Sequence, residues 1–243
     1  MYAYIEEIKR LLDQVDHNHE PIDQAVQLLI EAGVNKNSIF CFGAGHAGIL
    51  AQEMYYRAGG LMILNPIFSR DLMLDTEPVT YTSEVERLHG YGTLLAKKPP
   101  FTSGDVLLVH SVSGRNPVPI ELALAAKEKG VTVIAITNVT YTNHVTSRHQ
   151  SGLKLKDVAD IVLDNFGAIG DGAIQIEGSD QRVAPTSTVI GATIVNLLVS
   201  EMVQRWPTSD VLPVFYSANL DGGMAHNKEA IKTYYDQIHY RFE

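Results

Sequence analysis

Two turns rich in glycine and serine follow apolar runs of the sequence and have the composition of anion sites. The first, residues 43–48, reads Gly-Ala-Gly-His-Ala-Gly and follows Ser-Ile-Phe-Cys-Phe at 38–42. The second, residues 111–116, reads Ser-Val-Ser-Gly-Arg-Asn and follows Asp-Val-Leu-Leu-Val-His at 105–110. Where a buried strand passes into a helix, free backbone N–H groups and the positive end of the helix dipole favour phosphate. The two turns together therefore predict a site for a small phosphorylated ligand.

The second turn carries the side chains best suited to a phosphate group. Ser111 and Ser113 are two residues apart, so both hydroxyls can turn towards one site as the strand unwinds. Gly114 permits a tight turn, and Asn116 can cap a helix that begins at Pro117. Hydroxyls and N–H groups bind a phosphate monoester with little fixed charge, which suits an acidic protein. An ordinary helix cap is the alternative interpretation of this turn.

A third cluster, Ala-Pro-Thr-Ser-Thr at 184–188, also precedes a predicted helix. By itself such a cluster is more typical of a helix cap than of a ligand site. Together with the two turns it can close a phosphate pocket.

The first turn also matches the Gly-x-Gly-x-x-Gly pattern of dinucleotide-binding proteins. That pattern needs an acidic residue about 20 positions later to bind a ribose hydroxyl. The corresponding strand ends at Asn65 here, and His46 lies where a pyrophosphate needs close approach of the backbone. A nicotinamide would also leave the serine turn without a role. We therefore predict no cofactor, and no spacing of His, Cys or carboxylate residues indicates a metal site.

The elements that must position these turns alternate along the chain. A helical pair precedes the first strand. Apolar runs predict strands at 38–42, 61–64, 105–110, 131–137 and 161–164, with a further short strand at 173–176. Further helices are predicted near 46–58, 83–97, 117–129, 142–148, 185–205 and 226–240. Near-continuous apolar strands that alternate with helices indicate an α/β fold whose parallel sheet is covered on both faces.

Composition limits the class of protein. The 243 residues include 45% apolar residues, enough for one α/β domain with a substantial core. The net charge of −9 argues against nucleic acid or an anionic membrane surface as the main partner. The lone Cys41 fits a reducing compartment. The longest apolar stretch, 189–203, is interrupted by polar residues and is too short to span a bilayer. We therefore expect a soluble, cytoplasmic protein.

Residues 43–46, 111–116 and 185–188, in this order and spacing, resemble the sugar isomerase (SIS) domain family, and the phosphoheptose isomerase branch in particular. The resemblance covers residues 36–205, flanked by a helical extension at 1–35 and a C-terminal extension at 206–243, within a single domain. It implies a flavodoxin-like three-layer sandwich with a five-stranded parallel sheet, which binds a phosphorylated sugar at the C-terminal edge and forms homodimers or homotetramers with shared sites. The implied binding residues are Gly43, Gly45, His46, Ser111, Ser113, Gly114, Arg115, Asn116, Thr186, Ser187 and Thr188.

The resemblance does not extend to the metal-binding and catalytic set of phosphoheptose isomerases. That branch carries a His and a Glu one turn apart on the helix after the first turn. The corresponding residues here are Glu53 and Arg57. A second pair on the late helix corresponds to positions near Thr188 and Asn196. That set is therefore not reproduced in this sequence.

Candidate catalytic residues lie elsewhere. Isomerisation of an aldose phosphate needs a base that removes a proton next to a carbonyl, and a carboxylate in a partly dry site can serve. Glu84 and Glu86 follow the second strand, and Glu86 is favoured because His89 lies three residues on, one helical turn away. A neutral His46 can hydrogen-bond the ligand. His226 precedes the last helix, where the resemblance implies a His that completes the site of a neighbouring subunit.

Three functions remain open from the sequence. An isomerase of phosphosugars is the first. A phosphosugar lyase or etherase is the second, because the same proton abstraction can lead to elimination. The third is a non-catalytic module that binds a sugar phosphate.

Overall fold

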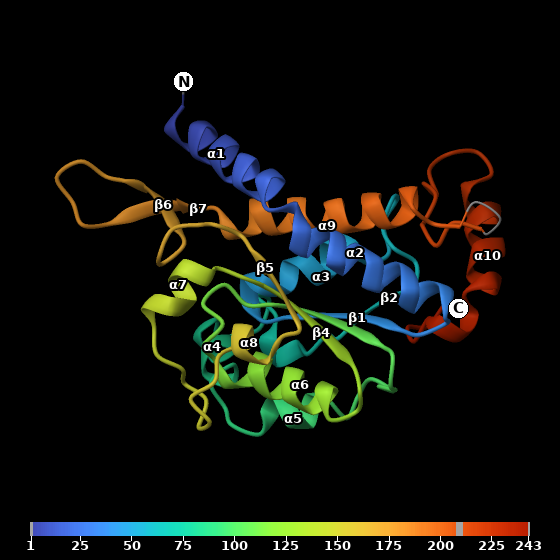
Figure 1. Cartoon of the computed structure of the whole chain (residues 1–243), viewed down its shortest axis with the longest axis horizontal. Coiled ribbons are helices and arrows are strands. Elements are labelled where there is room, and N and C mark those ends of the chain that lie inside the picture. The colour runs from blue at the N-terminus through green and yellow to red at the C-terminus, as the bar shows by residue number, and fades with distance from the viewer. Residues whose placement is uncertain (1, 208–210, 243) are drawn as a thin grey trace.

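Five short strands form one parallel sheet in the order β2-β1-β3-β4-β5 (Figure 1). The computed structural model describes residues 2–207 and 211–242. The strands are β1 (Ile39–Gly43), β2 (Leu64–Pro66), β3 (Val106–His110), β4 (Thr132–Thr137) and β5 (Ile161–Asp164). β1 and β3 are neighbours, and their register places Gly43 beside His110. The turns at residues 43–48 and 111–116 therefore leave the sheet side by side at its C-terminal edge.

Helices cover both faces of the sheet, which makes three layers (Figure 1). One layer contains α1 (Ala3–His17), α2 (His19–Val34), α3 (Ile49–Met54) and α9 (Ser187–Gln204). The other contains α4 (Thr80–Val85), α5 (Tyr91–Leu95), α6 (Pro117–Lys127) and α8 (Leu155–Val158). The short helix α7 (Val139–His144) lies at the C-terminal edge of the sheet, directly after β4. The predicted α/β fold with a five-stranded parallel sheet is confirmed.

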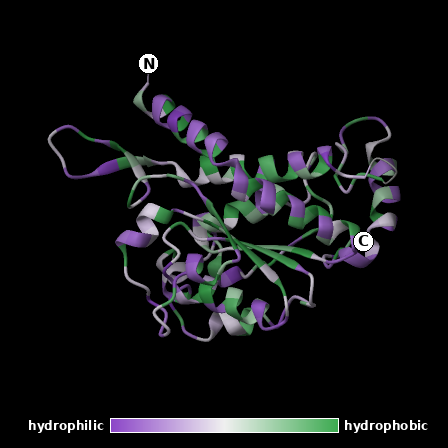
Figure 2. Ribbon diagram, in the orientation of Figure 1, coloured by the Kyte–Doolittle hydropathy of each residue, from purple (hydrophilic) through white to green (hydrophobic). Residues whose placement is uncertain are grey.

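The alternation of strand side chains divides the core in two. In β1, Ile39 and Cys41 pack under α2 and α9, whereas Phe40 and Phe42 pack under α6. The other central strands alternate in the same way, so apolar residues occupy both faces, and the strands are hydrophobic throughout (Figure 2). Burial on both sides explains why each strand reads as a continuous apolar run.

Helix α9 is largely apolar, although polar residues such as Asn196 and Glu201 interrupt it. Of the helices in the described part of the chain, it alone has the length and composition to cross a membrane. The core helices of folded domains meet the same criterion. Ile190, Ile194 and Leu198 are fully or almost fully buried against the α2–α3 layer.

A C-terminal segment closes the opposite, N-terminal edge of the sheet. It contains α10 (Gly223–Thr233) and the 3₁₀ turn η3 (Tyr235–Gln237). The Asn65 amide donates to the Gln237 carbonyl at 2.8 Å, and its oxygen accepts from the His239 N–H at 2.6 Å. The His239 ring lies 2.7 Å from Ser38 Oγ and stacks on Phe40. Asn65, which stands where a dinucleotide site needs an acid, therefore anchors this segment.

Several predicted elements differ from the observed ones. The predicted strand 61–64 is shifted to β2, because Leu61 pairs with Val214 and the Met62 N–H donates to Pro213. The predicted helix 46–58 is a 3₁₀ turn, η1 (Gly45–Gly48), followed by α3. The predicted helix 83–97 is split into α4 and α5 by a left-handed Gly90 (φ 85°).

Further differences concern the ends of elements. The predicted helix 142–148 begins earlier as α7, where Asn138 caps it by accepting the Tyr141 N–H at 2.7 Å. The last helix, predicted at 226–240, is observed as α10 and ends at Thr233. The short strand predicted at 173–176 is present as β6 (Gly172–Gln175). It pairs with β7 (Arg182–Pro185) in a hairpin that extends from the body of the molecule (Figure 1).

Candidate functional site

The first turn is a tight loop that only glycine can form at its start. A Cβ on Gly43 would lie 2.3 Å from the Ala47 carbonyl oxygen, so the backbone folds directly over this residue. Gly45 has a left-handed φ of 57°, and the chain then enters η1. His46 lies on η1 with an exposed side chain. The turn therefore presents His46 at the C-terminal edge while its glycines allow the close backbone approach.

His110 fastens the first turn to the second. Its Nδ1 lies 3.0 Å from the Ala47 carbonyl oxygen, which can only accept, so we assign the ring proton to Nδ1. The side chain is 2% exposed, and burial lowers the pKa of His110 to about 4. Within the described residues, the buried Nε2 has no hydrogen-bond partner. His110 is therefore a neutral, buried link between the two turns.

This burial predicts a pH dependence of stability. The folded-state pKa of His110 is depressed, so between pH 6.5 and 4 the unfolded chain binds the extra proton. The contribution of His110 to the free energy of unfolding is therefore complete above pH 6.5 and decreases as the pH falls. From pH 7.5 to 5.5 the loss is about 1.4 kcal/mol. Urea unfolding at both pH values should show a smaller difference for His110→Asn, whose amide keeps a donor for Ala47. An equal difference in both proteins would contradict the assignment.

The serine turn is held from behind, and its hydroxyls are left free. Thr137 Oγ donates to the Ser111 carbonyl at 2.7 Å, and Thr142 Oγ donates to the Ser113 carbonyl at 3.0 Å. Gly114 is left-handed (φ 60°) and packs against both threonines. The structure gives the hydroxyls of Ser111 and Ser113 no partner among residues 2–207 and 211–242. The backbone is thus fixed by bonds that leave both hydroxyls available to a ligand.

Glu86 joins this turn through Asn116. The Asn116 side-chain oxygen accepts from Arg148 Nη1 at 2.8 Å, and its amide also hydrogen-bonds the Glu86 carboxyl. The Val118 N–H donates to the Glu86 carbonyl at 3.3 Å, which anchors the end of α4 to the start of α6. Burial raises the pKa of Glu86, and the hydrogen bond from Asn116 only partly offsets this shift. A partly buried carboxyl with a raised pKa therefore borders the serine turn.

Two arginines, Arg148 and Arg87, lie near this carboxyl, and Arg115 lies near Arg148. Burial and the positive charges of Arg115 and Arg87 lower the pKa of Arg148, so both of these guanidiniums lie close enough to Arg148 to repel it. Arg115 Nη2 donates to Thr146 at 3.3 Å, and its buried Nε is without a partner in the described chain. In a protein of net charge −9, such a cluster is a local centre of positive charge that suits an anion.

The sequence predicted Arg115 but missed Arg87 and Arg148. Arg148 lies 33 positions beyond Arg115 and is brought back by the loop after α7, where its N–H donates to the Arg115 carbonyl at 2.9 Å. No spacing in the sequence indicates that this loop brings Arg148 back to Arg115. Arg87, next to Glu86, had no periodic pattern to set it apart.

The donors of the third cluster, residues 184–188, already hydrogen-bond a carboxylate of the same chain, that of Asp171. Asp171 accepts from the N–H groups of Thr186 and Ser187 at 3.2 and 2.9 Å, and from the Ser187 hydroxyl at 2.5 Å. The buried Thr186 Oγ has no partner in the described residues, and Thr188 is partly buried. Phosphate binding by Thr186, Ser187 and Thr188 therefore stays a prediction. It requires that the hydrogen bonds from Thr186 and Ser187 to Asp171 are broken first.

The remaining predicted residues are spread over the molecule. Glu84 is exposed on α4, and its side chain has no partner in the described structure. His226 lies on α10 against Tyr216, at the opposite end of the molecule from the turns. Only His226 of a second copy can therefore reach this site, and its role stays a prediction. Glu53 is paired with Arg57 at 2.5 Å and accepts from Asn196 at 3.0 Å, so a guanidinium stands where the resemblance implies a metal ligand.

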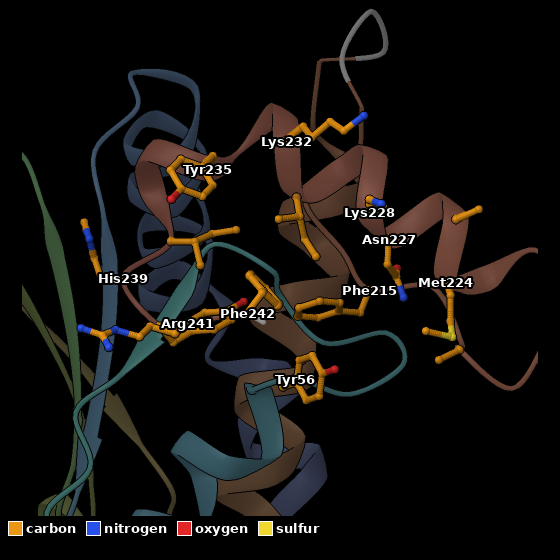
Figure 3. Close-up of a pocket in the computed structure, with 15 residues that line it drawn as sticks. Tyr56, Phe215, Met224, Asn227, Lys228, Lys232, Tyr235, His239, Arg241 and Phe242 are labelled. Carbon is orange, nitrogen blue, oxygen red and sulfur yellow. The ribbon is translucent and has the colours of Figure 1, made fainter.

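The cavities differ in place and size. A small cavity of about 40 Å³ lies beside the first turn and is lined by Gly43, Gly45 and the segment 67–74. A much larger cavity, about 930 Å³, lies at the other end, between α10 and the residues that follow it, 235–242. Figure 3 shows the rings of Tyr56, Phe215 and Phe242 within it, with Lys228 and Lys232 on the surrounding helix. Its distance from the turns separates it from the candidate site.

Comparisons with known proteins agree with this architecture. The family model of the SIS domain matches residues 3–138. A UPF0309 protein of Shouchella clausii is 50% identical over 98% of this chain and 97% of its own length. A UPF0309 protein of Oceanobacillus iheyensis is 45% identical over 99% of this chain and 98% of its own length.

Two solved structures share the fold at lower identity. A phosphoheptose isomerase from Francisella tularensis aligns with a TM-score of 0.53 and 18% identity, over 84% of this chain and 96% of that one. The Vibrio vulnificus NanR protein complexed with ManNAc-6P aligns with a TM-score of 0.51 and 16% identity, over 95% of this chain and 67% of that one. With the matched domain, the sheet order and the paired turns in agreement, the chain belongs to the SIS domain family and is a relative of the UPF0309 proteins.

Proposed function

We propose that this protein binds a phosphorylated sugar at the C-terminal edge of its sheet and interconverts its aldose and ketose forms. The observation that carries the proposal is the meeting of Glu86 with the serine turn through Asn116. One group of atoms there suits a phosphate, and the adjacent carboxyl suits proton transfer. The resemblance of the fold to a phosphoheptose isomerase and to a ManNAc-6P complex supports a phosphosugar as ligand.

In this proposal the serine turn holds the phosphate. The free hydroxyls of Ser111 and Ser113 donate to its oxygens, and Arg115 supplies positive charge. The fixed backbone of the turn means that these donors need little rearrangement on binding. His46 at the edge of the first turn hydrogen-bonds the sugar. The binding unit is one SIS domain over residues 36–205 with its two helical extensions.

Glu86 supplies the proton chemistry. As a carboxylate, it removes the proton from the carbon next to the open-chain carbonyl, which leaves an enediolate. It then returns the proton to the neighbouring carbon, while the hydroxyl proton moves between the two oxygens. The net result exchanges aldehyde for ketone with no atom gained or lost. Burial raises the pKa of Glu86 towards the range of an effective general base. A second copy of the chain, in a homodimer or homotetramer, brings His226 to this site.

Exchange in heavy water tests the proposal. The protein is incubated with a panel of heptose, hexose and amino-sugar phosphates, first in a thermal-shift screen and then for NMR. An increase in Tm together with deuterium at C1 or C2 of the sugar supports isomerisation. Loss of an ether substituent identifies a lyase, and an increase in Tm without exchange identifies a binding module. Absence of any increase in Tm across the panel contradicts phosphosugar binding.

Ser113→Ala tests the phosphate pocket. The change removes one hydrogen bond to a charged oxygen, worth about 1.5–3 kcal/mol, so Kd for the phosphorylated sugar should rise about 10–100-fold. The free sugar has no phosphate to lose and should bind about as before. Isothermal titration of both ligands gives the ratio. Equal losses for the two would place the phosphate elsewhere.

A further inference from the structure

A second cluster of potential ligands lies behind the candidate site. His89 follows α4, Glu121 belongs to α6 and His149 lies in the loop after α7. His89 Nδ1 is 3.8 Å from Glu121 Oε1, and His149 Nε2 is 3.9 Å from the same oxygen. The ligand atoms of the three side chains all lie within 4.8 Å of one another. The three residues come from separate parts of the chain, so spacing in the sequence could not reveal them.

The carboxylate at the centre is held in one orientation. Glu121 is buried, and its Oε1 and Oε2 accept the N–H groups of Gly90 and Gly92 at 2.7 and 3.0 Å. A Cβ on Gly92 would lie 2.7 Å from Glu121 Cβ, so the α5 backbone packs directly on this side chain. Glu121 therefore does more than cap α5, because the same oxygen that accepts from Gly90 also faces both imidazoles.

His149 is held on its Nδ1 side by Ser151. The ring is buried, and its Nδ1 lies 2.7 Å from the Ser151 hydroxyl. The Ser151 N–H donates to Nδ1 at 3.4 Å, so Nδ1 accepts in this arrangement, and a metal ion at Nε2 requires the ring proton to move to Nδ1, where the Ser151 hydroxyl can accept it. A hydrogen bond to the second ring nitrogen fixes the tautomer of most ligating histidines. His89 is half-exposed and leaves one side of the cluster open to solvent.

The distances fit a bridging ion better than direct hydrogen bonds. At 3.8 and 3.9 Å, neither imidazole hydrogen-bonds the carboxylate, since such bonds are about 2.7–3.2 Å long. Zinc bonds of about 2.0–2.2 Å that meet at a tetrahedral angle place their donors roughly 3.4 Å apart. The two imidazole–carboxylate distances need to shorten by about half an ångström, and the separation of the two imidazole nitrogens, which is within 4.8 Å, by up to about 1.4 Å; rotation of the half-exposed His89 can supply both.

We propose that His89, Glu121 and His149 bind a divalent transition-metal ion, with Zn²⁺ as the best match to two imidazoles and one carboxylate. The fourth position faces solvent beside His89. His89 lies three residues after Glu86, and His149 directly follows Arg148. The ion thus cross-links the turn after Glu86 to the loop that carries Arg148. This site is separate from Glu53, Arg57 and Asn196, and it does not depend on the identity of the sugar.

Direct metal binding tests this site without any sugar. The protein is stripped of metal and titrated with Zn²⁺ against a chromophoric chelator. We expect one Zn²⁺ per chain and an increase in Tm of the zinc-loaded protein. His89→Ala, at a half-exposed position that the fold does not need, should weaken binding by more than about 100-fold and abolish the increase in Tm. Ser151→Ala should weaken binding about 10–100-fold by releasing the His149 ring.

His144→Ala is the matched control, because His144 is exposed on α7 and lies outside the cluster. It should bind Zn²⁺ as tightly as the unaltered protein. Equal zinc affinity of the unaltered protein and His89→Ala would overturn the proposal, as would a loss of binding in His144→Ala alone. Since no sugar is present, failure of this test leaves the phosphosugar proposal untouched, and the reverse also holds.

Discussion

Glu86→Gln is expected to lower kcat for the isomerised sugar phosphate by about 10²–10⁴-fold, the usual contribution of a general base. Glutamine keeps the shape of the side chain and can still hydrogen-bond Asn116, but it cannot accept a proton from carbon. Binding of the sugar phosphate should therefore change little. Steady-state kinetics and deuterium exchange by NMR measure the loss, and isothermal titration measures the retained affinity.

Glu84→Gln is the control, since it makes the same change two residues away on an exposed side chain. It should leave kcat within about twofold of the unaltered protein, because surface substitutions of this kind have small effects. The pH profile adds a second readout: activity should fall as the pH drops through the raised pKa of Glu86, since the protonated acid cannot act as a base. Full activity in Glu86→Gln would assign the base to another residue.

Gly43→Ala should destabilise the protein by about 3 kcal/mol, at the upper end of the cost of overpacking. The added Cβ would stand 2.3 Å from the Ala47 carbonyl oxygen and 2.7 Å from the Gly48 nitrogen, and both neighbours are backbone atoms that cannot rotate away. For a chain of this size the decrease in Tm is about 6–12 °C. Thermal unfolding followed by circular dichroism gives the value.

Gly178→Ala separates this collision from the general cost of adding a side chain to glycine. Gly178 is exposed between β6 and β7 with a φ of 74°, and a Cβ there meets no atom within 4 Å. Its substitution should cost only about 1–2 kcal/mol, from backbone conformation alone. If Gly43→Ala cost no more than Gly178→Ala, the backbone contact over Gly43 would not exist as described.

The sheet was predictable because its strands are short, apolar and bounded by glycine and polar residues. Val106–His110 and Thr132–Thr137 lie within one residue of their predicted bounds. The prediction failed where a tertiary contact decides the local structure. Leu61 is apolar, but its bond partners are in the C-terminal segment, and the split between α4 and α5 depends on the buried carboxylate of Glu121. Neither partner is visible from the local sequence.

The sequence indicated the two turns of the candidate site and part of the side chains around them. The two turns at Gly43 and Ser111 stood out because both follow apolar strands and combine glycine with donor side chains. Arg148 and Asp171 were missed, since each reaches the site from a loop whose path the sequence does not encode in any period. The choice of Glu86 over Glu84 rested on His89, yet the structure links Glu86 to Asn116 and directs His89 towards Glu121.

The anchoring of the C-terminal segment has a consequence for how the chain folds during synthesis. His239 and Ser38 are 201 residues apart, and Gln237 donates to the carbonyl of Gly33, 204 residues earlier. At about 5–20 residues per second, the ribosome delivers the second partner roughly 10–40 s after the first. Throughout that interval the start of β1 lacks its contacts with the C-terminal segment. Molecular chaperones that recognise exposed apolar segments therefore have a defined period in which to act on this nascent protein.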